Sequence, residues 1–165
     1  MTSPANGADG RAPVVRFLDD LRAAESAAVE VFEAWIGACL LHGLRGALRT
    51  IAAREATHVE LLEARLVELG AEPTAAVAPD VRAAAVAHFG SAVVPDEEKL
   101  ALFLARYPDD RAAGRPLEAA VAALDAADAE TRELLTLVAE AEVATVAWLR
   151  AYLQGLSRSD AMIRR

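Results

Sequence analysis

The sequence is poor in the residues that build disulfide scaffolds, β-sheets and membrane spans. Cys39 is the only cysteine in 165 residues, so the chain cannot form an internal disulfide, which fits a cytoplasmic protein. Aromatic residues make up 5%, and no segment alternates apolar and polar residues for long enough to predict a sheet. The most apolar run, residues 31–41, contains Glu33 and is too short to cross a bilayer.

Positive charge is also scarce. Lys and Arg total 17 against 25 Asp and Glu, which gives a formal net charge of −8. Because nucleic acids and anionic membrane surfaces both attract basic proteins, this balance argues against either as a partner. Residues 1–12 lack the charged start and apolar centre of a signal peptide, and they are predicted to form a disordered leader.

Strong helix formers, chiefly Ala, Leu, Glu and Arg, dominate what is present, so the sequence predicts an all-α fold. The length suits one domain with a real core, predicted at residues 13–156. Prolines at helix starts and glycines at helix ends divide this domain into segments. The predicted helices are 13–39, 44–70, 79–89, 95–107, 116–124 and 128–156, followed by a polar tail at 157–165.

A leucine seam on the second long segment is interrupted by two polar residues. Apolar side chains recur there at steps of three and four, the spacing that keeps them on one helix face. Glu55 and His58 fall on the same face, between Ile51 and Leu62. Burying a carboxylate without a partner is costly, so a metal ion, an ion pair or a hydrogen-bonded pair is expected beside it. Without a metal, the candidate partners of Glu55 are His58 itself and an arginine, Arg49 or Arg54. The apolar members of the seam are Leu44, Leu48, Ile51, Leu62, Leu66 and Leu69.

Counting along the predicted hairpin places Glu25 at the height of Glu55. If the turn centres near residue 40, each lies 15 residues from it, or about 22 Å at about 1.5 Å per helical residue. On the last helix Glu142 falls on the inner seam, with Glu140 as the alternative if the phase shifts slightly. Three carboxylates and one imidazole are therefore predicted to meet in one layer. The predicted aromatic core residues are Phe32, Trp35, Trp148 and Tyr152.

Glu25, with an aromatic residue seven positions later at Phe32, is followed on the second helix by Glu55-Ala-Thr-His58. This arrangement resembles the ferritin-like superfamily, which includes rubrerythrins, bacterioferritins and related di-iron carboxylate proteins. The resemblance implies an antiparallel four-helix bundle, here with its third helix broken into short segments. It also implies Glu25, Glu55, His58 and Glu142 as the ligands of one metal position. Such an N/O donor set suits iron, manganese or zinc, and the family points to iron or manganese.

The second half of the chain departs from the family's pattern. Thr145 stands three residues after Glu142, where a second histidine would complete the motif. The resemblance therefore implies a complete first metal position and a depleted second one. His88 is predicted to be a surface or capping residue and is also a candidate replacement for the missing imidazole. The candidates for the remaining terminal carboxylate are Glu97, Glu98, Glu118, Asp125 and Asp128.

Three functions are compatible with these features, and the fold does not choose among them. A metalloprotein would use iron or manganese in redox chemistry with oxygen or peroxide. A metal-free ferritin-like bundle would instead be a dimerising or partner-binding module, and an exposed alanine-rich helix face favours a homodimer. Metal storage is the third, but storage needs a large hollow assembly that nothing in the sequence identifies. Whether the protein is an enzyme stays open at this stage.

Overall fold

The computed structural model describes residues 7–163, and within that range it contains helices and loops but no strand. This confirms the predicted all-α fold. None of the helices in the described range is both long enough and apolar enough to cross a membrane. The helices are α1 (Gly7–Ala38), α2 (His42–Glu68), α3 (Pro79–Phe89), α4 (Asp96–Leu104), α5 (Arg115–Ala123) and α6 (Ala129–Ile163).

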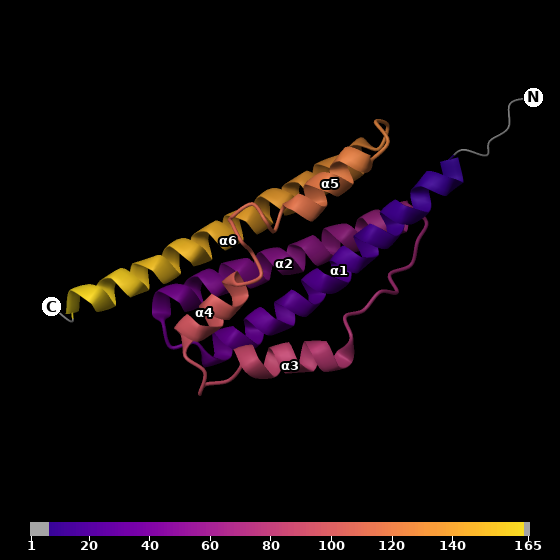
Figure 1. Ribbon diagram of the computed structural model, residues 1–165. Coiled ribbons are helices and arrows are strands. Elements are labelled where there is room, and N and C mark those ends of the chain that lie inside the picture. The colour runs from indigo at the N-terminus through magenta and orange to yellow at the C-terminus, as the bar shows by residue number, and fades with distance from the viewer. Residues whose placement is uncertain (1–6, 164–165) are drawn as a thin grey trace, which may run out of the picture.

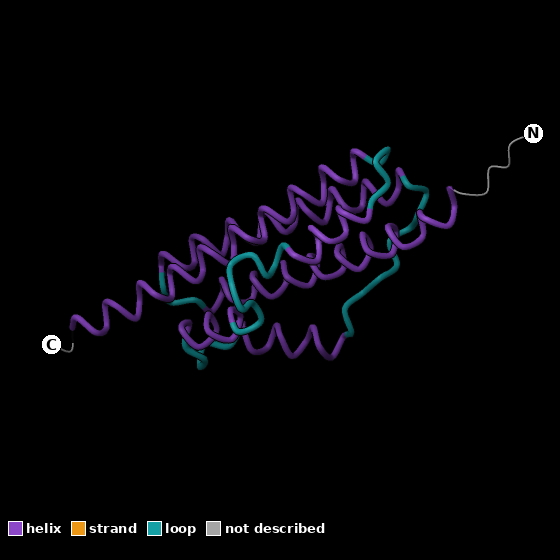
Figure 2. The backbone as a smooth tube through the Cα atoms, turned by 45° about the horizontal axis from the view of Figure 1, so that its top comes forward, coloured by secondary structure: helices purple, strands orange, loops and turns teal. Residues whose placement is uncertain are grey.

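The three long helices form one side of a bundle whose fourth position is interrupted. α1 and α2 make an antiparallel hairpin, and α6 lies along α2 (Figure 1). α4 and α5 both pack on α6, and the loop of residues 105–114 separates them (Figure 2). Together they take the place of a third bundle helix, which confirms the prediction that this helix is broken. α3 packs on α1 and belongs to the connection that leads from α2 to α4.

The core consists of two apolar clusters at different heights in the bundle. The first joins the later part of α1 to the start of α2 and the later part of α6. The second joins the earlier part of α1 to the end of α2 and the start of α6. Their fully buried members include Trp35, Leu44, Leu48 and Leu149 in the first cluster, and Leu18, Leu62, Leu66 and Val138 in the second. Between the two clusters, the inward positions of α1, α2 and α6 hold polar residues: Glu25, Glu55, His58 and Glu142.

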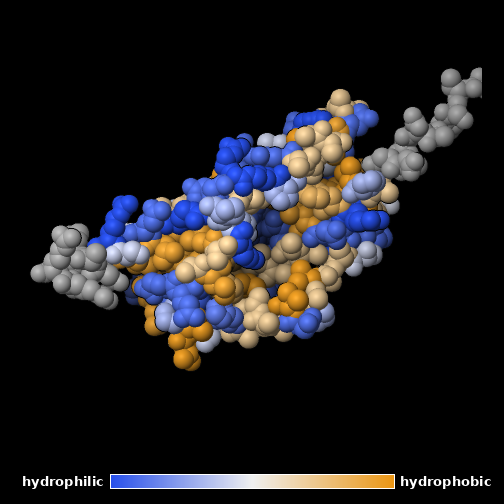
Figure 3. All heavy atoms as spheres, viewed as in Figure 1, coloured by the Kyte–Doolittle hydropathy of each residue, from blue (hydrophilic) through white to orange (hydrophobic). Residues whose placement is uncertain are grey.

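The predicted inward faces are confirmed on the three long helices, with one exception. Phe32 and Trp35 are buried, and Tyr152 is half-buried against the first cluster. The prediction that Trp148 belongs to the core is wrong, because its side chain is 42% exposed and stacks on the ring of Tyr152 instead. Over the face seen in Figure 3, polar and apolar residues are interspersed.

Two helix ends differ from their predicted positions. α1 begins at Gly7 and contains Pro13, although an interior proline removes one backbone hydrogen bond and its ring crowds the carbonyl four residues earlier. Residues 7–12 of the predicted leader are therefore helical, and residues 1–6 lie outside the described range. α6 continues to Ile163, through most of the predicted tail at 157–165, because an interior glycine such as Gly155 weakens a helix by only about 1 kcal/mol. Residues 164–165 are also outside the described range.

The end of α2 is built as its sequence predicts. Gly70 has a φ of +72°, a conformation that residues with a Cβ rarely adopt. Its N–H donates to the Val67 carbonyl, and the N–H of Ala71 donates to the Leu66 carbonyl. This pair of hydrogen bonds is the Schellman motif, which stops the helix and turns the chain towards α3.

Asp19 of α1 fixes the chain that follows α2. Its Oδ2 accepts hydrogen bonds from the backbone N–H groups of Thr74 and Ala75, at 2.8 and 2.7 Å, and Arg22 donates to Oδ1 at 2.9 Å. Burial by itself raises the pKa of Asp19, but these donors outweigh it and the pKa is lowered overall. The ionised carboxylate therefore holds residues 71–78 against the bundle.

We expect Asp19→Asn to lose about 1–3 kcal/mol of stability at pH 7, because an NH2 group that cannot accept hydrogen bonds replaces one carboxylate oxygen, so either Arg22 or the backbone N–H groups lose their acceptor. A lowered folded-state pKa contributes stability above the ordinary pKa of an aspartate, and this contribution is lost as the pH falls through the folded value. In urea unfolding between pH 7 and pH 2.5, the free energies of unfolding of wild type and Asp19→Asn should therefore become equal at low pH. A difference in unfolding free energy that stays constant over this pH range would show that the effect does not come from the charge of the carboxylate.

Candidate metal centre

A layer of polar side chains lies between the two apolar clusters. Glu25 comes from α1, Glu55 and His58 from α2, and Glu142 from α6. Each falls on the inward face of its helix because the apolar repeat runs through its position. The structure thus brings together the four residues predicted from the sequence.

These four side chains are close and largely shielded from water. One potential ligand atom from each lies within 4.8 Å of the others. Glu25, Glu55 and His58 are 5%, 3% and 1% exposed, and Glu142 is half-buried. Nδ1 of His58 is 3.5 Å from Oε2 of Glu55 and 3.6 Å from Oε2 of Glu25. These separations allow electrostatic attraction but exceed the length of an ordinary hydrogen bond.

Two of the carboxyl groups resist ionisation in this layer. Burial raises the pKa of Glu55 to about 7, with a further contribution from the neighbouring Glu25. Burial also raises the pKa of Glu142 to about 7, and the charge of Glu55 adds to this effect. The buried surroundings therefore disfavour the ionised form of both carboxyl groups, and a nearby positive charge would be needed to stabilise it.

His58 responds in the opposite sense. Burial lowers the pKa of its imidazole, but Glu25 and Glu55 outweigh burial and raise it to about 9. In the absence of a metal, the imidazolium is therefore the counter-charge that the carboxylates hold between them. A divalent cation can replace that proton, and binding it must release protons from the site.

The unsatisfied atoms of the layer fit a metal ion. Within the described part of the chain, Nδ1 and Nε2 of His58 and Oε1 of Glu142 are buried without a hydrogen-bond partner. Buried polar atoms are usually paired, so such atoms in one cluster call for a ligand. Oxygen and nitrogen ligands lie about 2.0–2.2 Å from transition-metal ions, which puts opposite ligands about 4.4 Å apart. The spread of the four groups is close to that value, and their donor set suits Fe(II), Mn(II) or Zn(II).

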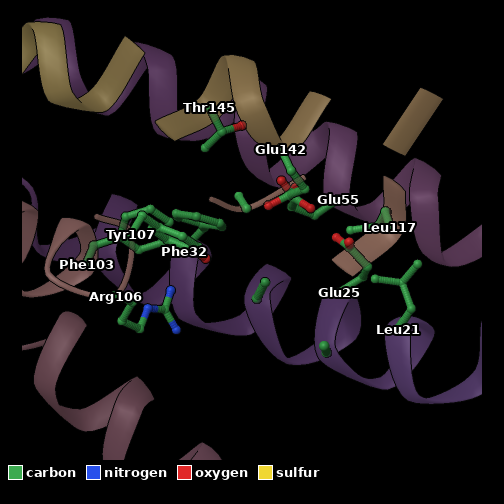
Figure 4. A pocket seen from close by; sticks show the side chains of 13 residues that line it. Leu21, Glu25, Phe32, Glu55, Phe103, Arg106, Tyr107, Leu117, Glu142 and Thr145 are labelled. Atoms are coloured by element: carbon green, nitrogen blue, oxygen red, sulfur yellow. The ribbon is translucent and has the colours of Figure 1, made fainter. Parts of the chain in front are cut away.

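A cavity of about 210 Å³ adjoins the three carboxylates. Figure 4 shows the carboxyl groups of Glu25, Glu55 and Glu142 close together, with the rings of Phe32, Phe103 and Tyr107 further along the same space. The interruption of the third helix contributes Arg106, Tyr107 and Ala113 to the lining. A molecule of a few atoms can therefore reach the carboxylates without displacing a core side chain.

The other predicted candidates lie elsewhere. Glu140 is exposed, so Glu142 is the residue of α6 that faces inward. His88 lies on α3 with its ring against Phe89, on the far side of α1, because α3 packs outside the bundle. The acidic candidates for a further ligand do not join the cluster, since the third helix is interrupted where a helix-borne carboxylate would have to stand. Those residues are Glu97, Glu98, Glu118, Asp125 and Asp128.

Sequence reasoning missed the residues that line the far end of the cavity. It placed Tyr107 on a helix, whereas α4 ends at Leu104 and Tyr107 lies in the turn that follows. Arg106 lies over the rings of Phe103 and Tyr107, with its guanidinium carbon 4.8 and 5.4 Å from their centroids. Pro108 and the polar run that follows it predict a break here, but they place the end of the helix three residues later than the structure does.

Comparison with known proteins agrees with this architecture. A family model described as a ferritin-like domain of actinomycetes matches residues 9–164, which is nearly the whole chain. No curated protein and no solved structure matches it. The chain therefore belongs to the actinomycete family of ferritin-like domains.

Proposed function

We propose that Glu25, Glu55, His58 and Glu142 bind one divalent transition-metal ion, iron or manganese, and that the protein carries out redox chemistry on a small oxidant such as dioxygen or peroxide. The observation that supports this most strongly is the convergence of four groups in a buried layer, with both imidazole nitrogens of His58 lacking a hydrogen-bond partner. When bound, iron or manganese would supply one-electron redox chemistry at this position.

The residues around the ion have separate roles in this proposal. The three carboxylates supply negative charge and hard oxygen donors, while Nδ1 of His58 is the nitrogen that faces two of them. Phe32 and Phe103 exclude bulk water from one end of the cavity. Burial raises the pKa of Tyr107, so its phenol keeps its proton at neutral pH and is available as a hydrogen-bond donor.

The first test is metal content. Protein purified without chelator should contain about one metal ion per chain, and stripped protein should take up about one Fe(II) or Mn(II) without oxygen present. An ion that binds only the folded state at 100 times its dissociation constant adds about 2.7 kcal/mol of stability. We expect His58→Ala to lose both the uptake and the metal-dependent rise in melting temperature.

His42→Ala is the matched control, because His42 is exposed at the start of α2 and stands outside the cluster. It should behave as wild type in both measurements. Wild-type protein that stays metal-free and melts at the same temperature with and without added Fe(II), Mn(II) and Zn(II) would refute the proposed site.

A second candidate function is the metal-free interaction module. The exposed Trp148 favours it, since this side chain borders a groove of about 560 Å³ between α2 and α6 with Gly43, Gly46 and Ala47 along one wall. Large exposed aromatic groups beside small residues are common where helices of two molecules meet. Sedimentation of wild type and Trp148→Ala would separate the candidates: a dimer lost in the variant supports the module, and a metal-bound monomer supports the metalloprotein.

A further inference from the structure

A second positively charged group stands at the cluster, next to Glu55. Nη2 of Arg54 lies 3.9 Å from Oε1 of Glu55, whereas Nδ1 of His58 lies 3.5 Å from Oε2 of the same carboxylate. The two oxygens of Glu55 therefore face two different groups. One faces the side where His58 and Glu25 converge, and the other faces a guanidinium.

Thr145 holds that guanidinium in place. Nη2 of Arg54 donates a hydrogen bond to Oγ1 of Thr145. The hydroxyl proton of Thr145 is donated to the carbonyl of Ala141 at 3.1 Å, so the oxygen offers its lone pairs to the arginine. Thr145 follows Glu142 by three residues and shares its helix face, which places both at the edge of the cluster.

Arg54 can keep its charge here. Its side chain is 31% exposed and borders the groove between α2 and α6, while its Nε is buried without a hydrogen-bond partner. An arginine is not deprotonated in proteins, and this charge is therefore permanent. It also attracts the carboxylate of Glu142.

The charges of the cluster balance with one metal ion. Three ionised carboxylates carry three negative charges, and a divalent ion with one guanidinium carries three positive charges. A second divalent ion beside Arg54 would leave the buried layer with an excess of positive charge, which is unfavourable in a low-dielectric interior.

We propose that Arg54, held by Thr145, occupies the side of Glu55 and Glu142 that a second metal ion would otherwise use, and that it limits the site to one ion per chain. This inference rests on the proposed metal-binding function. Arg54 is a specificity-determining residue in this view and not a metal ligand.

The experiment is a Mn(II) titration of metal-free protein, followed by electron paramagnetic resonance of free Mn(II) and by native mass spectrometry. Wild type should bind one ion. Arg54→Gln removes the charge but keeps a polar side chain, and it should bind the first ion at least about tenfold more tightly because a repulsive neighbour is gone. The double variant Arg54→Gln/Thr145→His gains an imidazole beside the vacated position and should bind two ions per chain.

Two further variants serve as controls. Arg49→Gln removes an exposed arginine from the same helix and should leave both stoichiometry and affinity unchanged. Arg54→Lys keeps a positive charge beside Glu55 and should bind one ion, as wild type does. If the double variant does not fold, the affinity of Arg54→Gln decides, and an affinity equal to that of wild type would overturn the inference.

The outcomes also separate this inference from the proposed function. Two ions bound by wild type, or one ion bound by a folded double variant, would overturn the role of Arg54 while leaving the metal site intact. No Mn(II) bound by wild type would instead remove the metal site, and the role of Arg54 with it.

Discussion

Glu55→Gln is expected to abolish metal binding and to leave the metal-free protein at least as stable as wild type. The carboxylate of Glu55 lies between His58 and Arg54, so an ion bound by the four groups of the cluster would lose one of its ligands in this variant. An amide lacks the negative charge, and even the loss of a partner that only touches a ligand typically weakens metal binding 10–100-fold. We therefore expect the affinity for Fe(II) or Mn(II) to fall by at least about 100-fold.

The stability of metal-free Glu55→Gln should depend on pH in a defined direction. Burial raises the pKa of Glu55 to about 7. A carboxyl group whose pKa is raised by folding costs stability once the pH exceeds its unfolded pKa, and the cost is complete above the folded pKa. Removing that charge should therefore add about 1–3 kcal/mol at pH 8, and this gain already allows for the lost attraction to His58, which is one of the causes of the folded pKa. The difference should vanish near pH 4.

Urea unfolding of metal-free protein at pH 4.5 and pH 8 measures this difference. Glu140→Gln is the control, because Glu140 is exposed on α6 two residues from Glu142. It should change neither metal binding nor stability by more than about 0.5 kcal/mol. A loss of several kcal/mol in Glu55→Gln at pH 8 would show that the Glu55–His58 pair is a structural ion pair, contrary to the metal-site proposal.

The candidate site was predictable because helix periodicity fixes which residues share a face. Glu55 and His58 interrupt a leucine repeat, and the structure buries both at those positions. Glu25 followed from the length of the hairpin, which depends only on the helical rise. On α6 the sequence leaves Glu140 as an alternative to Glu142, since an alanine-rich helix offers two similar inward faces, and packing against α2 and α5 distinguishes the two residues.

The cavity beside the interrupted third helix and the contact of Arg54 with Thr145 were beyond this kind of reasoning. Periodicity says which way a side chain points, but it does not say that residues 105–114 leave a cavity beside the carboxylates. Arg54 and Arg49 were equal candidates as partners of Glu55 from the sequence. The structure places Arg54 at Glu55 and Arg49 in solvent, because only Arg54 can reach Thr145 on α6.

The sequence pattern likewise predicts the position of Asp96 at a helix start but not its buried contacts. The acidic run at residues 96–98 predicts a helix start, and α4 does begin there. The pattern does not reveal that Asp96 is buried and accepts hydrogen bonds from Trp35 Nε1 at 2.8 Å and from the backbone N–H groups of Leu40 and Leu41 at 2.9 and 3.3 Å. This carboxylate joins the turn between α1 and α2 to the start of α4, so the broken third helix is anchored at this end.

Trp35→Ala should therefore cause the largest loss of stability among the changes considered. The side chain of Trp35 is fully buried, its ring lies 5.1 Å from that of Phe89, and its N–H pairs with Asp96. Truncating a buried tryptophan typically costs about 3–5 kcal/mol, and here it also removes a donor from a buried carboxylate. Trp35→Phe keeps most of the volume and should cost about 1–3 kcal/mol, mainly for the lost hydrogen bond.

Trp148→Ala is the matched control, since it removes the same side chain from a position that is 42% exposed. Its effect on urea unfolding should stay within about 1 kcal/mol, and equal losses in the two alanine variants would contradict the packing described here. Trp35 lies in the first apolar cluster and not in the polar layer, so Trp35→Phe should still bind one metal ion per chain. The stability of the bundle and the occupancy of the site can thus be changed separately, because they depend on different layers of the same helices.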